Sequence, residues 1–359
     1  MKKTWIAAAA FGLVVVTMAG ADRAPKTASF DVRHELEVTV ADGTKSLKIW
    51  FVLPAESDPA QKVSDLEIES PYPHKIVTDS EGNRLLYVEV SEPKQKEFSI
   101  IETFSLTRSE VVSGVAEEKA RPISEEERAK HAKHLEGNAN VPIDDEIKAL
   151  ARKIVGDETN PVRIARKLYD WELGEIEYWV KDPKNRKASP VGSTKYCLEN
   201  KTGNCTDFHS LWTSLARASG IPTRMVYGSF FKLELAGIDQ DQSYHCWPEF
   251  FVPGVGWVPH DVAVADIFKG TYPVDDANAR LIRLTTANGY AGEDPSMVEY
   301  YFGNIDERRV TWTWGRDLQM SPKQDGGPVN ALPKAYVEAD GKLVAEKAGW
   351  TRKLTYRNK

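Results

Sequence analysis

Gly203-Asn-Cys-Thr-Asp-Phe208 opens a predicted helix and Ser219-Gly-Ile-Pro222 closes it. Asn204 is a favourable N-cap residue, with the acidic Asp207 three residues later, and a glycine followed by a proline is typical of a helix end. Between the two ends, apolar residues recur at helical spacing. We expect this stripe to face a core; it consists of Phe208, Leu211, Trp212, Leu215 and Ala216.

Cys205 is the first residue inside this predicted helix, and its position favours a reactive thiolate. Free backbone N–H groups and the positive end of the helix dipole lie there, and both stabilise negative charge. A nucleophilic cysteine needs such a setting, because the thiol pKa must fall from about 8.5 toward neutrality. The same N–H groups could hold an oxyanion after attack on an acyl carbon. The alternative is a small buried core thiol, but Cys205 lies outside the apolar stripe.

A cysteine nucleophile also needs an imidazole, and His245 is the best placed of the 7 histidines. It lies near the start of a predicted strand, 244–252, at the mouth of the sheet. Asp261 follows on the next predicted strand, 256–264, where it could orient the imidazole. Each residue alone is a weak signal, and the combination is what indicates a catalytic group.

Together these segments resemble the core of the transglutaminase-like superfamily. The resemblance implies a papain-like α+β fold with a triad, in which Cys205 is the nucleophile, His245 the acid and base, and Asp261 the residue that orients the imidazole. It is specific from about 203 to 261 and plausible over 140–280. It rests on Gly203-Asn-Cys-Thr-Asp-Phe208, Gly220-Ile-Pro-Thr-Arg224, His245-Cys-Trp-Pro-Glu249 and Gly256-Trp-Val-Pro-His-Asp261, while the tail around Gly303-Asn-Ile-Asp-Glu-Arg-Arg309 resembles bacterial exported members.

Pro248 departs from the usual family pattern His-Ala-Trp-Val-Glu. A proline removes a hydrogen-bond donor from a strand, which indicates an edge or a bulge. If Gly254-Val-Gly256 is a three-residue hairpin loop, Asp261 faces Glu249 and lies roughly 13 Å along the sheet from His245, at about 3.3 Å per residue. We therefore expect a bulge near Pro248 or a strong twist to bring the two side chains together.

The chain divides into segments of different pattern. Period-two alternation with intervening turns predicts antiparallel strands near the N-terminus, and helical spacing appears later, over 143–154 and 162–171. The polar residues 180–201 are predicted to form a loop. The expected units are an all-β domain at 28–112, a helical linker at 113–140, a transglutaminase-like catalytic core at 141–280 and a C-terminal extension at 281–359 that packs on the core.

Composition and the N-terminus bear on location and partners. The 359 residues include 47 Lys and Arg against 53 Asp and Glu, and neither sign gathers into long runs, so nothing points to a nucleic-acid partner. Residues 1–21 combine two lysines, an apolar run from Trp5 to Met18 and the small residues Ala19-Gly-Ala21, which predicts a removable signal peptide. The run is too short to span a bilayer, which takes about 20 residues. We therefore expect an exported protein, periplasmic or extracellular, with no membrane span after signal removal.

A metal site is a rival interpretation of the same segments, with Cys205, His209, His245, Cys246 and His260 as its ligands. Adjacent strand residues point to opposite faces, so four ligands do not converge easily. We expect neither a metal nor a cofactor. The acidic residues Asp239 and Asp241 lack the spacing of an EF-hand, so their loop is interpreted as solvated and not as a calcium site.

The three cysteines leave at least one thiol unpaired. Cys246 stands where the family usually has alanine. In an oxidising compartment, a Cys197–Cys246 bridge would leave Cys205 free, whereas a Cys197–Cys205 bridge would silence the enzyme. We favour the first bridge or none.

These observations predict an acyl-transfer enzyme that acts on amide bonds of a protein or peptide through a thioester. We favour hydrolysis, as a peptidase or amidase, because no feature identifies a binding tunnel for an amine acceptor. The alternative within the enzyme class is a transglutaminase that joins glutamine side chains to amines. The alternative outside it is a binding module that keeps the fold without turnover.

Overall fold

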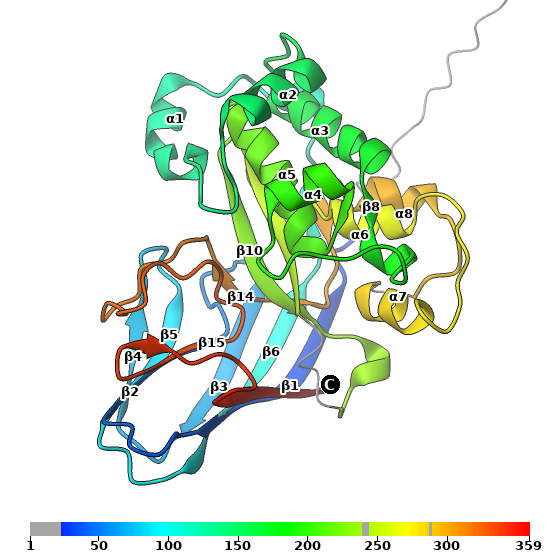
Figure 1. Ribbon diagram of the computed structural model, residues 1–359. Coiled ribbons are helices and arrows are strands. Elements are labelled where there is room, and N and C mark those ends of the chain that lie inside the picture. Colours follow the sequence, from blue (N-terminus) through cyan, green and yellow to red (C-terminus); the bar gives the residue numbers. More distant parts are fainter. Residues whose placement is uncertain (1–22, 239–243, 287–288) are drawn as a thin grey trace, which may run out of the picture.

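The computed structural model describes residues 23–238, 244–286 and 289–359, with helices gathered in one half and long strands in the other (Figure 1). The expected signal peptide at 1–21 and the residues Asp239 and Asp241 lie outside the described residues. The helices are α1 (Glu125–Lys130), α2 (Asp145–Val155), α3 (Pro161–Glu175), α4 (Thr194–Asn200), α5 (Cys205–Ala218), α6 (Val262–Ile267), α7 (Ala279–Thr285) and α8 (Pro295–Tyr300), with short 3₁₀ turns η1 (Glu117–Lys119), η2 (Ala132–Leu135), η3 (Trp179–Lys181) and η4 (Leu233–Leu235).

The strands alternate between buried and exposed side chains where one face of a sheet meets a core. In β6, every second residue from Phe98 onward is buried, as the period-two pattern predicts. The strands are β1 (Thr27–Thr39), β2 (Ser46–Val52), β3 (Gln61–Glu69), β4 (His74–Thr78), β5 (Arg84–Ser91), β6 (Glu97–Ser109), β7 (Val111–Val112), β8 (Glu177–Tyr178), β9 (Thr202–Gly203), β10 (Thr223–Phe230), β11 (Tyr244–Val252), β12 (Gly256–Pro259), β13 (Asn304–Ile305), β14 (Arg309–Trp314), β15 (Ala335–Ala339), β16 (Lys342–Leu343) and β17 (Trp350–Asn358).

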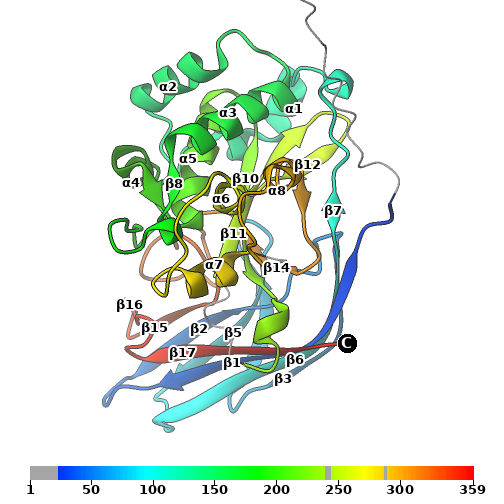
Figure 2. The same ribbon diagram turned by 90° about the vertical axis from the view of Figure 1, so that its right-hand side faces the viewer.

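Two antiparallel sheets build the strand-rich half, in the orders β17-β1-β6-β3 and β16-β15-β2-β5-β4. Each sheet joins strands from both ends of the chain: Phe30 of β1 pairs with Asn358 of β17, and Ile49 of β2 pairs with Val337 of β15. Figure 2 shows β17 lying alongside β1. The strands of residues 281–359 therefore fall in both halves of the molecule. β15, β16 and β17 belong to the strand-rich half, whereas β14 joins a sheet of the helix-rich half.

The helix-rich half is built around α5, which packs against β10 and β11 of the sheet β12-β11-β10-β14. Helices α2, α3 and α4 contact the other sides of α5, so every residue from Cys205 to Arg217 is buried. The predicted apolar stripe is confirmed, since its five residues have no exposed surface. The predicted α+β fold, an all-β region ahead of a helix that packs on an antiparallel sheet, is confirmed as well.

Two local predictions are wrong. The stretch 180–201 is not all loop, because Ser193 accepts a hydrogen bond from the Tyr196 N–H (3.3 Å) and caps the short helix α4. The predicted strand 256–264 ends at Pro259 instead. Asp261 then accepts a hydrogen bond from the Val264 N–H (3.0 Å) and begins α6, so a capping interaction ends the strand early.

Candidate active site

The N-terminus of α5 places Cys205 as the sequence predicts. The Asn204 side chain accepts hydrogen bonds from the N–H groups of Thr206 (2.9 Å) and Asp207 (3.1 Å), and the Asp207 carboxylate accepts the Asn204 N–H (3.0 Å). Gly203 is required just before this cap, because a Cβ there would lie 2.3 Å from the Cβ of Asp207. The cap therefore fixes Cys205 at the positive end of the helix dipole.

The hairpin of β11 and β12 brings Asp261 to His245 by a register that differs from the expected one. Glu249 pairs with Pro259, two residues earlier than the expected Asp261, and the pairing runs without a bulge. The expected register is therefore wrong, and of the two features expected to close the gap, a bulge near Pro248 or a strong twist, the pairing does not have the bulge. Beyond Pro259 the chain turns into α6, and this turn carries the Asp261 carboxylate toward His245.

Pro248 is tolerated because β12 ends beside it. The Pro248 carbonyl accepts a hydrogen bond from the His260 N–H (3.2 Å), at the point where regular pairing with β12 stops. In an antiparallel strand, the N and the C=O of one residue point to the same side. The missing N–H of Pro248 therefore faces the end of β12, where no ladder partner requires it.

His245 and Asp261 form a buried pair. His245 Nε2 lies 2.7 Å from Asp261 Oδ2, and the two residues are 2% and 0% exposed. Because Asp261 takes the Nε2 atom, Nδ1 is the ring nitrogen left to serve Cys205. His245 acts on Cys205 through its charge and a hydrogen bond, so the structure brings together the three residues predicted for the triad.

Asp261 has further partners that the sequence analysis did not identify. Arg309 Nη1 donates to the same Oδ2 atom (2.6 Å), and Arg309 Nε donates to Asp306 Oδ2 (3.0 Å). His209 Nε2 lies 3.3 Å from the other carboxylate oxygen, Oδ1. The pattern Asp306-Glu-Arg-Arg309 is visible in the sequence, but only the pairing of β14 with β10 brings it to the site.

Cys246 lies at the site instead of in a disulfide. Its Sγ atom is 3.5 Å from Thr206 Oγ1 and 3.6 Å from His209 Nδ1, and the same Thr206 oxygen lies 3.9 Å from Cys205 Sγ. Tyr244 Oη is 2.8 Å from Thr206 Oγ1. All three cysteines are free. Of the two favoured possibilities, a Cys197–Cys246 bridge or no bridge, the structure therefore shows no bridge.

The charges of this group favour a thiolate and an imidazolium. Hydrogen bonding to Cys246 and the positive charge of His245 hold the pKa of Cys205 well below its usual range, although burial raises it. Burial also lowers the pKa of His245, but the charges of Asp261 and Cys205 outweigh this and raise it to about 9. The pKa of Asp261 stays well below its usual range, because His245 and Arg309 outweigh burial. At neutral pH the histidine is therefore protonated, and the lowered pKa of the cysteine favours its thiolate form.

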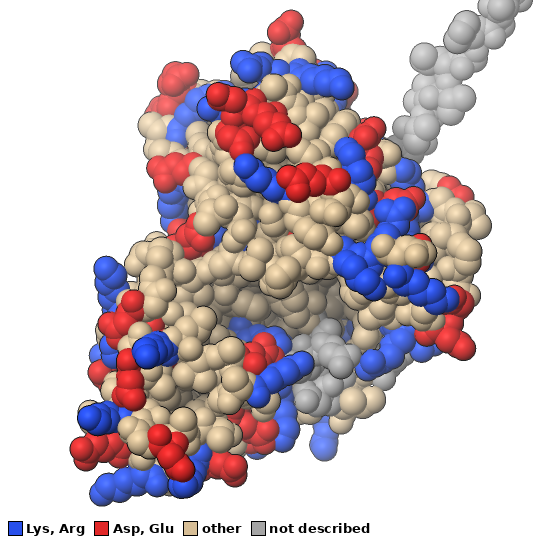
Figure 3. Space-filling view, in the orientation of Figure 1, with Lys and Arg blue, Asp and Glu red and all other residues tan. Residues whose placement is uncertain are grey.

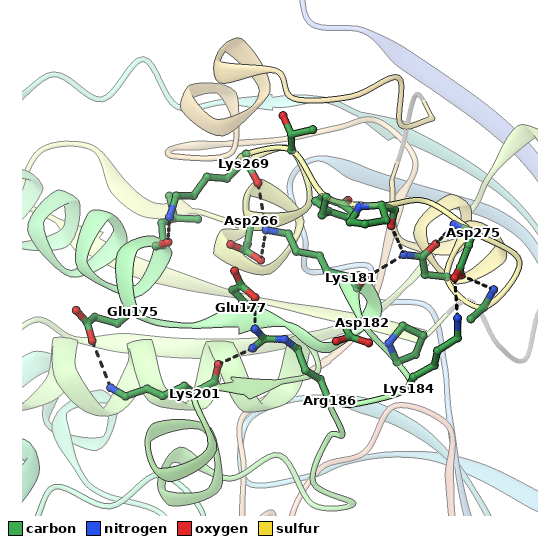
Figure 4. Close-up of a pocket in the computed structure, with 18 of the residues that line it drawn as sticks. Glu175, Glu177, Lys181, Asp182, Lys184, Arg186, Lys201, Asp266, Lys269 and Asp275 are labelled. Atoms are coloured by element: carbon green, nitrogen blue, oxygen red, sulfur yellow. Dashed lines mark hydrogen bonds and ion pairs between the residues drawn. The ribbon is translucent and has the colours of Figure 1, made fainter.

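A cavity of about 630 Å³ lies outside this group, between the end of α3, β8, η3 and the segment after α6. Its charged side chains neutralise one another across the cavity wall (Figure 4), as in the pairs Lys181–Asp266 (2.9 Å) and Lys184–Asp275 (2.7 Å). None of the three predicted catalytic residues lines it. On the face shown in Figure 3, a separate hollow of mostly uncharged surface lies between the helix-rich and strand-rich halves.

In the described ranges of the chain, no three His, Cys, Asp or Glu side chains are grouped so that they could hold a metal ion. His260, one of the residues considered for such a site, packs instead against the ring of Trp212, with centroids 4.0 Å apart. None of the helices in the described ranges has the length and apolarity that a membrane span needs.

Comparisons with known proteins agree with this description. Residues 148–262 match the model of the transglutaminase-like superfamily. A protein of Haemophilus influenzae, named only as uncharacterized, is 25% identical over 342 residues, which cover 87% of this chain and 86% of the relative.

Solved structures that are similar to this chain include two bacterial proteins. A candidate cysteine protease from Cytophaga hutchinsonii gives a TM-score of 0.48 at 16% identity, covering 92% of this chain and 98% of its own. The periplasmic domain of TgpA from Pseudomonas aeruginosa gives a TM-score of 0.32 at 14% identity, and the match covers 66% of this chain and 87% of the TgpA chain. The predicted recognition is confirmed for this region: residues 148–262 match a transglutaminase-like core.

Proposed function

We propose that this protein, whose residues 148–262 form a transglutaminase-like core, is an exported cysteine peptidase or amidase that cleaves amide bonds through a thioester. The observation that carries the proposal is the position of Cys205 at the capped N-terminus of α5, where it interacts with His245, which is itself paired with Asp261. A thiolate in that position is a nucleophile, and an imidazolium beside it is an acid for the leaving group.

In the first half of the reaction, the Cys205 thiolate attacks the carbonyl carbon of the substrate amide. The oxyanion that forms is stabilised by the positive end of α5. His245 then gives its proton to the amide nitrogen, the C–N bond breaks, and an amine leaves. The products of this half are the free amine and a thioester on Cys205.

In the second half, water attacks the thioester carbonyl. His245 is now neutral and takes the proton of that water, the C–S bond breaks, and a carboxylic acid is released while the thiolate returns. Asp261 stabilises the imidazolium at each stage and holds the ring by its Nε2 atom. A primary amine in place of water would give transamidation.

Labelling of the thiols tests the nucleophile. Iodoacetamide near neutral pH should alkylate Cys205 much faster than Cys197, whose pKa burial raises well above the usual range. Cys205→Ala should abolish both this labelling and the cleavage of a peptide substrate. Cys197→Ala is the matched control and should change neither. Equal, slow labelling of both thiols would instead favour a binding module without turnover.

Product analysis separates hydrolysis from cross-linking. A glutamine-containing peptide is incubated with the enzyme, with and without a primary amine, and the products are identified by mass spectrometry. Our proposal expects peptide cleavage or ammonia release that the amine changes little. Incorporation of the amine in excess of these products would assign the site to a transglutaminase.

Export rests on the N-terminal pattern of residues 1–21. A C-terminally tagged full-length protein should appear in the periplasmic or extracellular fraction, with a mass that has lost the first 21 residues. A matched variant in which two lysines replace Val14 and Val15 should stay inside the cell. An unprocessed protein in the cytoplasm would contradict export and leave the catalytic proposal untouched.

A further inference from the structure

We infer that Arg309, which lies outside the matched core, is a positioning residue for the catalytic pair, because it shares the Asp261 oxygen that faces His245. This inference rests on the proposed function and deepens it. It assigns part of the catalytic machinery to the C-terminal segment, beyond residues 148–262.

The contacts of Arg309 fix its position on two sides. One carboxylate oxygen, Asp261 Oδ2, receives both Arg309 Nη1 (2.6 Å) and His245 Nε2 (2.7 Å). The other side of the guanidinium is held by Asp306 through Nε (3.0 Å). A planar guanidinium that bridges two carboxylates cannot rotate without breaking both contacts. Asp261 is therefore held with Oδ2 toward the imidazole.

The surroundings of Arg309 are closed and aromatic. The side chain has no exposed surface, and its guanidinium carbon lies 4.1 Å from the centroid of the Phe230 ring, with Trp247 and Tyr301 at 5.6 Å. Stacking of a guanidinium on aromatic faces is attractive and excludes water. The interaction with Asp261 is thus made in a dry, low-dielectric place, where charges act most strongly.

The sheet explains how a distant residue reaches the site. β10 pairs with β11 on one side and with β14 on the other, so Gly228 lies opposite His245 and, across the other edge, opposite Thr311. The β10–β14 register shifts at Gly228, where a Cβ would lie 2.3 Å from the Val310 carbonyl oxygen. Glycine therefore permits the close approach that carries Arg309 to Asp261.

The charge of Arg309 also limits how tightly Asp261 holds the proton of His245. A cation on the same oxygen competes with the imidazolium, and the second half of the proposed reaction needs a neutral imidazole. Without Arg309, the proton would be held more tightly and release of the acid would slow. The ionisable or charged groups around His245 include Cys205, Asp261 and Arg309, the ring of His209, and the chain neighbours Tyr244 and Cys246.

The test compares Arg309→Met and Arg309→Lys with a matched control, Arg308→Met. Arg308 precedes Arg309 and is also largely buried, but it contacts Asn358 (2.7 Å) and the Phe30 ring. The titration of His245 is followed by NMR of labelled histidine rings and assigned with His245→Gln. Peptide cleavage is measured over pH in the same full-length proteins, and circular dichroism confirms that each variant is folded.

We expect Arg309→Met to raise the midpoint of the His245 titration by roughly one pH unit and to lower kcat about tenfold or more, with a smaller change in KM. Arg309→Lys keeps the positive charge but loses the planar guanidinium that bridges the two carboxylates. The midpoint of the His245 titration should therefore move less, while kcat still falls. Arg308→Met should leave both readouts unchanged.

An unchanged midpoint together with kcat within twofold of wild type would overturn the inference. If Arg309→Met does not fold, Asp306→Asn releases the guanidinium without touching Asp261, and the same shift is expected at smaller size. If the wild type shows no Cys205-dependent cleavage, the proposed function fails, whereas the NMR titration still decides the role of Arg309.

Discussion

A pair of a histidine and a carboxylate is buried in each half of the molecule, and these two pairs differ in charge. In the helix-rich half, His245 and Asp261 are 2.7 Å apart, and their pKa values move in the directions that keep both groups charged. In the strand-rich half, His34 Nδ1 and Glu102 Oε2 are 3.3 Å apart. There burial lowers the pKa of His34 and raises the pKa of Glu102, each well beyond its usual value, so burial favours the neutral form of both groups.

The difference comes from what surrounds each carboxylate. Asp261 accepts hydrogen bonds from Arg309 and from the Val264 N–H in addition to the imidazole. Glu102 Oε1 and His34 Nε2, in contrast, have no hydrogen-bond partner within the described part of the chain. Burial alone gives a neutral pair, because an uncompensated charge is costly in a low dielectric. The hydrogen-bond donors already in place around Asp261 are what make its pair with His245 ionic.

Asp261→Asn should have the largest effect, because it removes the carboxylate from the ionic pair. An asparagine can still accept the Val264 N–H and cap α6, but it cannot stabilise an imidazolium. We expect kcat/KM for peptide cleavage to fall by about 10⁴-fold with an unchanged fold. The measurement is steady-state cleavage, with circular dichroism as the control. A decrease of less than tenfold would show that the charge of Asp261 does not matter for catalysis.

The pH profile of the wild type should show the ion pair directly. His245 has a raised pKa of about 9, so it is protonated below that value and loses its proton as the pH rises through it. Acylation needs that proton, so kcat/KM should fall about tenfold for each pH unit above 9. On the acid side, activity should extend to lower pH than a thiol of ordinary pKa would allow, because the pKa of Cys205 is lowered. A loss of activity that begins near pH 7 on rising pH would contradict this.

Cys246→Ala should have a moderate effect. The Cys246 thiol stays protonated, since burial raises its pKa well above the usual range, and it is the hydrogen-bond donor to Cys205. Without that donor the pKa of Cys205 should rise, moving the acid limb of iodoacetamide labelling to higher pH and lowering the rate at pH 6 about tenfold. Cys246→Ser keeps a donor and is the matched control. If the two variants behave alike, the hydrogen bond is not the cause.

Glu102→Gln should have the smallest effect, and it should affect stability only. The raised pKa of Glu102 means that the folded state keeps a proton which the unfolded state releases above about pH 4.5, so the carboxyl group costs stability as the pH rises. Glutamine removes this cost. We expect Tm to rise by roughly 2 to 4 °C at pH 8, about 1 kcal/mol, and less at pH 5, with unchanged peptide cleavage. A lower Tm at both pH values would contradict the neutral pair.

Part of the site could be predicted because its signals are local. The cap at Asn204, the apolar stripe of α5 and the glycine and proline after it are contiguous in the sequence, and they fix where Cys205 lies. His245 and Asp261 belong to one hairpin, so they could be paired in advance. The separation between His245 and Asp261 was overestimated, because the register of β11 and β12 depends on the hairpin turn and β12 ends at Pro259.

The remaining contacts could not be read from local pattern. Arg309 reaches Asp261 only through the pairing of β14 with β10, and strand order is not encoded by spacing. His209 and Cys246 were candidate metal ligands in the sequence, yet in the fold they line the same charged group as the triad. Helix α4 escaped notice since its 7 residues are too few to show an apolar period and its cap, Ser193, follows a stretch without apolar periodicity.

The pairing of β1 with β17 has a consequence for biogenesis. The two strands are hydrogen-bonded along nine residue pairs, from Phe30 opposite Asn358 to Val38 opposite Trp350, although most of the described chain lies between them. On the ribosome, β1 is made well before its partner β17. That edge of the sheet therefore stays open, and available to chaperones, until β17 has been made.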